Sequence, residues 1–108
     1  MKVRKQKREY FGRFTVKALA TVAKHKEDQG LTFKYEAFQS LINRAIDSGI
    51  DPAVIAATNS GDIDRGCKIT SVRFDRGFYL YISEIAKSMG VPISKLITAS
   101  LEYEGEGA

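Results

Sequence analysis

The 108-residue sequence predicts a small, mainly α-helical fold with a short two-stranded β-ribbon, arranged as one domain or as two very small halves that share a core. Two observations lead to this expectation. Apolar residues recur at helical spacing in several separate segments, and two of these segments stop at a glycine, Gly30 and Gly90. Residues 68–74 alternate in polarity as a half-buried strand does, and a lone strand needs a partner.

The first half of the chain is expected to hold one strand and two long helices. Residues 10–16 are aromatic and β-branched, which is typical of a short strand. A helix is expected over 17–30, because Gly30 suits the left-handed position that follows a helix. A second helix is expected over 34–49. Its apolar stripe comprises Ala37, Phe38, Leu41, Ile42 and Ala45.

A short helix and a linker separate the two halves. Asp51 followed by Pro52 is typical of an N-cap with proline at the first helical position, which predicts a helix through Ala57. The strand, the two long helices and this short helix together make up the first unit, 10–57, whose main order is strand-helix-helix. Residues 58–67 offer turn-forming side chains and little to pack, so they are expected to form a linker.

The second half, 68–104, has the order strand, helix, sharp turn, helix. One face of the strand over 68–74 is expected to be inward and comprises Thr70, Val72 and Phe74. The opposite face comprises Ile69, Ser71 and Arg73. A helix is expected over 76–89, and Pro92 suits the first turn of a last helix that reaches about Tyr103.

The strand over 68–74 could pair with the same strand of a second chain or with residues 10–16 of its own chain. A weak internal repeat bears on this choice. The dipeptide Arg-Phe occurs at 13–14 and again at 73–74, and a helix-ending glycine follows each Phe sixteen residues later. Both features therefore repeat at an offset of sixty positions. An intramolecular ribbon and a homodimer both stay open.

Positive charge is concentrated at the start of the sequence. Residues 1–26 carry nine Lys or Arg and one acidic residue, whereas the remainder carries eight basic and twelve acidic residues. So basic a segment attracts a polyanion, since each phosphate that it neutralises releases counterions. The alternative is a solvated terminus that only aids solubility. Residues 1–9 are treated as a basic arm.

Several classes of protein are disfavoured. No apolar run approaches the ~20 residues of a bilayer-spanning helix, and the basic start lacks the apolar stretch of a secretory signal. The single cysteine, Cys67, excludes an internal disulfide and a multi-cysteine zinc site. The only histidine, His25, lies in a lysine-rich helix and is expected to face solvent. We therefore expect no enzyme, no cofactor, no metal and a cytoplasmic location.

The second half resembles a known family. Arg73 precedes Phe74, a glycine follows sixteen residues later, Ile85 and Ala86 precede that glycine, and the sequence PISKLI follows it. These spacings resemble the ribbon-helix-helix DNA-binding proteins, the group of the Arc, CopG and methionine repressors. The resemblance covers 68 to about 103, roughly a third of the chain. It implies two units whose strands form an antiparallel ribbon in the major groove, as a homodimer or an intramolecular pseudo-dimer.

The resemblance also implies which residues contact bases. Ile69, Ser71 and Arg73 would face base edges, and Arg73 suits the O6 and N7 atoms of guanine. If residues 10–16 form the partner strand, its outward set comprises Phe11, Arg13 and Thr15, with Phe14 and Val16 inward. Arg13 and Thr15 are then further base contacts. Two units in one chain would be similar to the conjugative-plasmid accessory proteins of the TraY type.

Contacts with DNA phosphates are expected at two places. The start of the last helix would present backbone amides near Ser94, with charge added by Lys95 and by Lys68. The basic arm would add the cations Lys2, Arg4, Lys5, Lys7 and Arg8.

The family's commonest role implies a transcriptional repressor or autoregulator that binds double-stranded DNA, with a homodimer or higher oligomer on the DNA and no membrane. One alternative is an accessory protein of a plasmid transfer complex. Others are an antitoxin-type module that grips a protein partner, and a non-specific architectural binder that depends on the arm alone.

Overall fold

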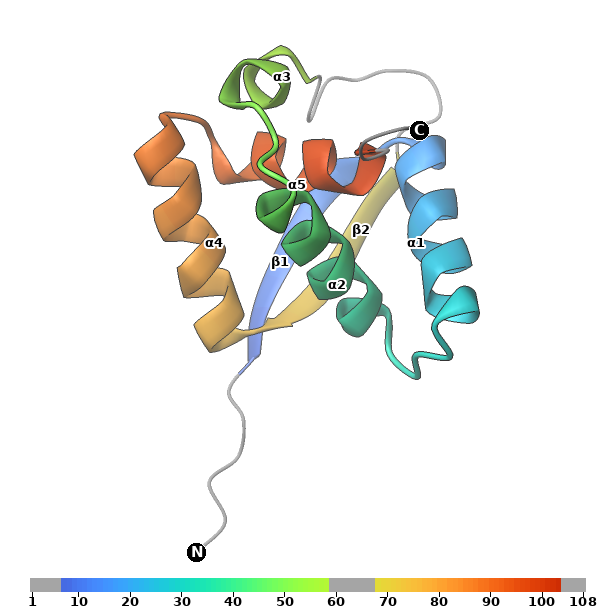
Figure 1. Ribbon diagram of the computed structural model, residues 1–108. Helices are drawn as coiled ribbons and strands as arrows, with labels where there is room; N and C mark the ends of the chain where they lie inside the picture. The colour runs from blue at the N-terminus through green and yellow to red at the C-terminus, as the bar shows by residue number, and fades with distance from the viewer. Residues whose placement is uncertain (1–6, 59–67, 104–108) are drawn as a thin grey trace, which may run out of the picture.

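The computed structural model describes residues 7–58 and 68–103, which form two strands and five helices (Figure 1). In chain order these are β1 (Lys7–Phe14), α1 (Val16–Asp28), α2 (Lys34–Asp47), α3 (Pro52–Ala57), β2 (Lys68–Asp75), α4 (Arg76–Met89) and α5 (Ile93–Glu102). The expected class, mainly helical with a two-stranded antiparallel sheet, is confirmed.

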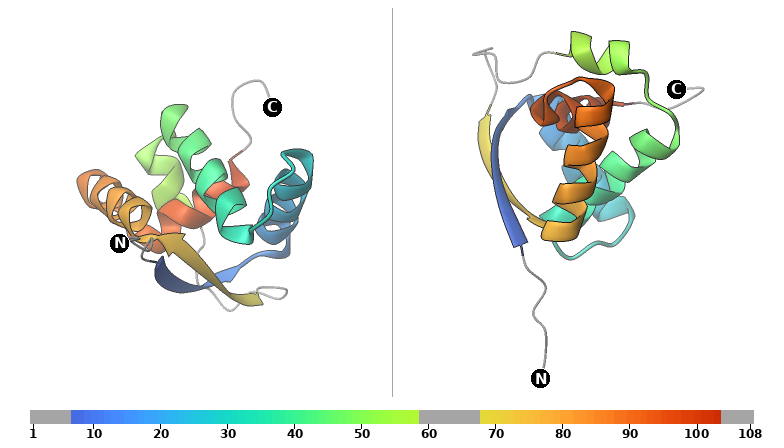
Figure 2. Two further views of the ribbon diagram at one scale, coloured as in Figure 1. Left: turned by 90° about the horizontal axis from the view of Figure 1, so that it is seen from below. Right: turned by 90° about the vertical axis from the view of Figure 1, so that its left-hand side faces the viewer.

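The described helices lie on one face of the two-stranded ribbon, and no described helix or strand covers the other face, which is here called the open face (Figure 2). Helices α2 and α5 cross in the middle of the helical layer, while α1 and α4 flank them on opposite sides. The short α3 packs against α5 at one end of the molecule. Each half therefore supplies one strand, one flanking helix and one central helix.

The partner of β2 is β1 of the same chain. The two strands run antiparallel, from Lys7 opposite Asp75 to Phe14 opposite Lys68. Phe11 lies opposite Ser71, near the middle of the ribbon. Of the two alternatives that the sequence left open, the structure has the intramolecular pairing.

The boundaries of β1 differ from the expected 10–16. The strand begins at Lys7, within the expected arm, and ends at Phe14. Thr15 is instead the N-cap of α1, and its side-chain oxygen accepts a hydrogen bond from the Ala18 N–H at 3.1 Å. Val16, which was expected to point inward, starts the helix and is 57% exposed. The β-branched side chains of Thr15 and Val16 suggested that the strand continues through them. The strand ends before Thr15 because its hydroxyl instead caps the first turn of α1.

The helix signals in the sequence are largely confirmed. Gly30 and Gly90 adopt φ angles of 64° and 72°, the left-handed conformation that ends a helix at little steric cost. Asp51 caps α3 by accepting a hydrogen bond from the Ala53 N–H at 2.8 Å, with Pro52 as the first helical residue. None of the helices within 7–58 and 68–103 is long and apolar enough to cross a bilayer.

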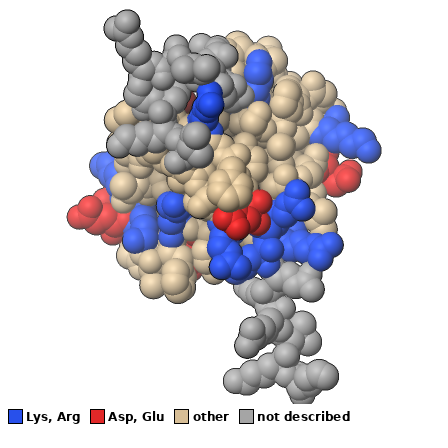
Figure 3. Space-filling model, turned by 180° about the vertical axis from the view of Figure 1, so that it is seen from behind, with Lys and Arg blue, Asp and Glu red and all other residues tan. Residues whose placement is uncertain are grey.

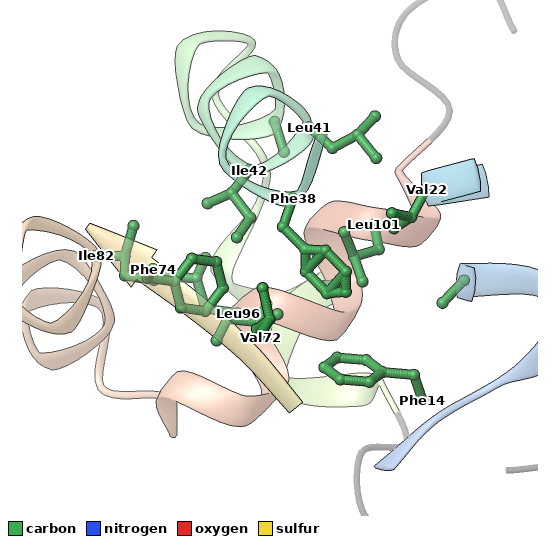
Figure 4. Close-up of a cluster of buried hydrophobic side chains, with 14 of the residues drawn as sticks. Phe14, Val22, Phe38, Leu41, Ile42, Val72, Phe74, Ile82, Leu96 and Leu101 are labelled. Atoms are coloured by element: carbon green, nitrogen blue, oxygen red, sulfur yellow. The ribbon is translucent and has the colours of Figure 1, made fainter. Parts of the chain in front are cut away.

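One aromatic residue of α2 joins both strands to the helical layer. The ring of Phe38 meets that of Phe14 in β1 edge-on, with centroids 5.4 Å apart, and that of Phe74 in β2 at 6.1 Å (Figure 4). All three rings are at most 1% exposed. The whole predicted stripe of α2 is buried, as are Leu96 and Leu101 of α5 beside it. Both halves therefore share one core.

Replacing Phe38 with Ala is expected to lower the free energy of unfolding by about 3–5 kcal/mol, because loss of a buried ring leaves a cavity under the ribbon. Urea unfolding of both proteins measures the difference. Phe33→Ala is the matched control, because that ring is 58% exposed and only stacks on Tyr35, so its loss should cost about 1 kcal/mol or less. Equal losses in the two variants would contradict the assigned core.

Candidate nucleic-acid interface

The open face of the ribbon presents alternate residues of both strands. Tyr10, Gly12 and Phe14 of β1 point toward the helices, so the residues between them point away. The residues of the open face with described side chains are Glu9, Phe11, Arg13, Ser71 and Arg73. All of these are exposed except Ser71, which is half-buried.

The register divides this face into a centre and two ends. Phe11 opposite Ser71 forms the centre, and Phe11 is 66% exposed. At one end Arg13 lies opposite Ile69. At the other end Arg73 lies opposite Glu9. One guanidinium therefore stands at each end of the face.

The two arginines are separated by a distance that DNA can match. Ile69, opposite Arg13, and Arg73 are four residues apart on β2, which is about 13 Å at the usual rise of a strand. That length equals about four base pairs. Each guanidinium can form a bidentate pair with a guanine.

The ribbon side of the molecule carries several groups of basic side chains. Figure 3 shows Lys and Arg gathered around a small acidic patch on this side. Arg8 is not on the open face, since it lies opposite the buried Phe74, but it is exposed and lies over the ring of Tyr79 in α4 at 5.1 Å. Stacking orients the guanidinium and leaves its donors accessible, as a phosphate contact requires.

Lys7, which was expected to contact a phosphate, is engaged within the protein. Its Nζ lies 2.7 Å from Asp75 Oδ1 and 3.5 Å from the centre of the Tyr35 ring. Gln39 of α2 holds the same aspartate, since it accepts a hydrogen bond from the Asp75 N–H at 2.9 Å and donates one to Oδ2 at 3.2 Å. Lys7 thus fastens the end of the ribbon to α2 and to the start of α4.

The interactions of Lys7 raise its pKa above the ordinary value of about 10.5. Burial opposes the charge and by itself lowers the pKa, but the Asp75 carboxylate and Tyr35 more than compensate. The ammonium group is therefore charged at neutral pH, and its charge is directed at Asp75.

Lys95 and Ser94, at the start of α5, are also less free than expected. The Nζ of Lys95 donates a hydrogen bond to the Ala56 carbonyl oxygen at 2.7 Å and so ties α5 to α3. Ser94 is half-buried and has an interaction of its own. The N-cap residue Pro92 makes no side-chain hydrogen bond, so the first amides of α5 are not capped by its side chain. Further into the helix, the amides of Lys95 and Leu96 donate hydrogen bonds to the Pro92 carbonyl oxygen at 3.1 and 3.2 Å.

Thr15 does not lie on the open face. Besides capping α1, its hydroxyl donates a hydrogen bond to Glu102 Oε2 at 3.3 Å, which links the start of α1 to the end of α5. The expectation that Thr15 belongs to the outward set of the strand is therefore wrong, because it follows the strand as a helix cap.

Several predicted contacts lie where the structure describes little or nothing. Lys68 and Ile69 have described backbones in β2, opposite Phe14 and Arg13, but not described side chains. The arm residues Lys2, Arg4 and Lys5 lie outside the described residues, as does most of the expected linker 58–67.

His25 is half-buried and does not simply face solvent. Its Nε2 lies 2.9 Å from Ser40 Oγ, so the ring joins α1 to α2. Burial and the nearby Arg44 guanidinium lower its pKa, although Asp28 acts in the opposite direction. The imidazole is therefore neutral at pH 7 and contributes to helix packing.

Sequence reasoning missed Glu9 as a member of the open face. Glu9 fell within the expected arm, where it counted only as a charge. The signal that could have found it is the offset of sixty positions, which relates Glu9 to Ile69 just as it relates Arg13 to Arg73.

Comparison with protein-family models, with curated proteins and with solved structures finds no match for this chain. Within the described ranges, no group of three or more His, Cys, Asp or Glu is placed to hold a metal ion.

The stabilisation that Lys7 provides is expected to be constant between pH 7 and about 10, and to decrease above about pH 10.5, where the ammonium group begins to lose its proton. The difference in unfolding free energy between the wild type and Lys7→Met, about 1 kcal/mol, measures it. Lys24→Met is the control, since that lysine is exposed and 3.7 Å from Asp28, so its effect should be near zero at every pH. If Lys7 contributed as much to the unfolding free energy at pH 11 as at pH 7, its contribution would not depend on the charged interaction with Asp75.

Proposed function

We propose that this chain binds double-stranded DNA in a sequence-specific manner, with the open face of its ribbon in the major groove, as a ribbon-helix-helix pseudo-dimer. The observation that carries the proposal is the pair of exposed arginines, Arg13 and Arg73, at opposite ends of a ribbon whose other face is sealed by helices. A two-stranded ribbon fits the major groove, and arginine is the commonest reader of guanine there.

The register of the ribbon supports an internal pseudo-twofold axis. Phe11 lies opposite Ser71, and these two residues are sixty positions apart. The residue that the repeat makes equivalent to Phe11 is therefore its own cross-strand partner, so a twofold axis would pass between the two. The same offset relates Arg13 to Arg73 at the two ends. It also relates Gly30 to Gly90, both in the left-handed conformation, and the buried Val22 to the buried Ile82. Two related half-sites on DNA are what such an axis would fit.

The central pair and the two ends have different chemistry. Arg13 and Arg73 suit guanines about four base pairs apart. Phe11 suits the methyl group of thymine, and the hydroxyl of Ser71 suits either base type. Because Phe11 and Ser71 differ, as do Glu9 and Ile69, the DNA site would be only partly palindromic.

Phosphate contacts would hold the ribbon in the groove. We assign them to Arg8, to the backbone amides at the start of α5, and to the arm residues 1–6. Lys7 and Lys95 are not included, because the Asp75 carboxylate and the Ala56 carbonyl engage their ammonium groups.

The biological role that we propose is repression of transcription in the cytoplasm, without catalysis or a cofactor. An accessory role in plasmid transfer is the second candidate. It is favoured by the pairing of β1 with β2 in one chain, which is the arrangement that the sequence resemblance to the TraY type implied. A module that acts only by gripping a protein partner would enrich no DNA motif that depends on Arg13 and Arg73, so the experiment below also separates that role.

Selection of bound duplexes from a random pool, at matched moderate salt, tests the proposal. The wild type should enrich a motif, and Arg73→Ala and Arg13→Ala should each lose one guanine of it, about four base pairs apart, at a cost of about 1–3 kcal/mol. Lys87→Ala is the control, since it removes one exposed charge from the last turn of α4 and should leave the motif unchanged. Absence of enrichment by the wild type, or a motif identical in all variants, would refute base reading by the ribbon.

Removal of residues 1–6 should weaken binding to cognate and unrelated duplexes by the same factor. Three cations are lost, so the slope of log K against log salt should become shallower by about 3, and the ratio of cognate to unrelated affinity should stay constant. The deletion stops before Lys7 because that residue belongs to β1. The undeleted chain with Lys2→Gln, Arg4→Gln and Lys5→Gln is the matched control, and loss of specificity in either variant would contradict a phosphate-only role.

A further inference from the structure

Glu9 is an acidic side chain on the open face of the ribbon, between basic neighbours. It is exposed and lies directly opposite Arg73. The described side chains include no ion-pair partner for it within 4.0 Å. A surface that only attracts phosphates gains nothing from a carboxylate at this position, since the carboxylate repels them.

The bases with an amino donor in the major groove are cytosine (N4) and adenine (N6), and the carboxylate suits cytosine better, because the N7 acceptor of adenine lies beside its amino group. Glu and Asp accept a hydrogen bond from the N4 amino group of cytosine, whereas guanine and thymine offer them only acceptors on that edge. Facing residues of an antiparallel pair have Cβ atoms about 5 Å apart, comparable to one base-pair step. Glu9 and Arg73 can therefore reach the same base pair or two neighbouring ones.

Contact with DNA would cost Glu9 little of its existing stabilisation. Attraction between two exposed, oppositely charged side chains is weak in water, where it is screened by solvent and salt. Arg73 can turn to guanine and Glu9 to cytosine without loss of a strong internal interaction, in contrast to Lys7, whose carboxylate partner is also held by Gln39.

We infer that Glu9 selects a cytosine next to the guanine read by Arg73, and that this selection fixes the direction in which the ribbon lies on its DNA site. The inference rests on the proposed function. At the other end of the ribbon the equivalent position is Ile69, a residue without a hydrogen-bond acceptor in its side chain. Only the Arg73 end of the ribbon would then prefer cytosine. The free energy of binding would therefore differ between the two orientations of the ribbon on a near-palindromic site.

The test extends the duplex selection to Glu9→Gln and Glu9→Ile, with Glu27→Gln as the control for loss of an exposed carboxylate on α1. In Glu9→Gln the preference for cytosine beside the Arg73-dependent guanine should fall roughly tenfold or more, with a gain for adenine, the base that glutamine reads. In Glu9→Ile both ends carry an arginine opposite an isoleucine, so the selected motif should become more palindromic. Glu27→Gln should select the wild-type motif.

Two results would overturn the inference and are distinguishable. If Arg73→Ala loses a guanine while both Glu9 variants keep every wild-type base preference, Glu9 is not a reader and the proposed function stands. If the wild type enriches no motif at all, both the reader role and the proposed function fail. Circular dichroism of each variant verifies that the fold is unchanged, as expected for an exposed position.

Discussion

The packing of Phe38 against Phe14 and Phe74 is the interaction on which the rest of the structure depends. A two-stranded ribbon is at best marginally stable by itself in water. Here one ring from α2 packs against a ring from each strand, so a single residue joins both strands of the ribbon to the helical layer. Because the inner face of the ribbon supplies the stability, the side chains of the open face need not pack in the core.

The junction around Asp75 has a second structural role. Asp75 ends β2 and precedes α4, while its carboxylate holds Lys7 at the beginning of β1 and its amide and carboxylate engage Gln39 of α2. Three elements distant in the sequence therefore meet at one residue. The junction also divides the basic segment, because Lys7 belongs to the fold whereas Arg8 and Arg13 keep exposed charge.

Much of the helical structure could be predicted because it depends on local signals. The stripe of α2, the glycines after α1 and α4, and the Asp-Pro start of α3 each involve residues that are close in sequence. The partner of β2 could not be predicted, since pairing depends on packing across the whole chain. The length of β1 was also missed, because its first residues are charged and resemble an arm, and because Thr15 is equally suited by composition to a strand and to a cap.

The candidate site shows the same division. Period-two alternation correctly separated Arg73 and Ser71 from Val72 and Phe74, and the inferred outward position of Arg13 was right as well. The fates of Lys7 and Lys95 could not be read from sequence, because their partners, Asp75 and Ala56, lie 68 and 39 residues away. Charge alone does not tell which lysines remain available.

The pairing of β1 with β2 in one polypeptide affects how the protein behaves when it is scarce. A ribbon built from two chains exists only while the chains are associated, so at low abundance the number of ribbons falls with the square of the chain concentration. Here each chain contains both strands, and the number of ribbons is directly proportional to the number of chains. A cell that holds only a few copies would still hold the same few complete ribbons.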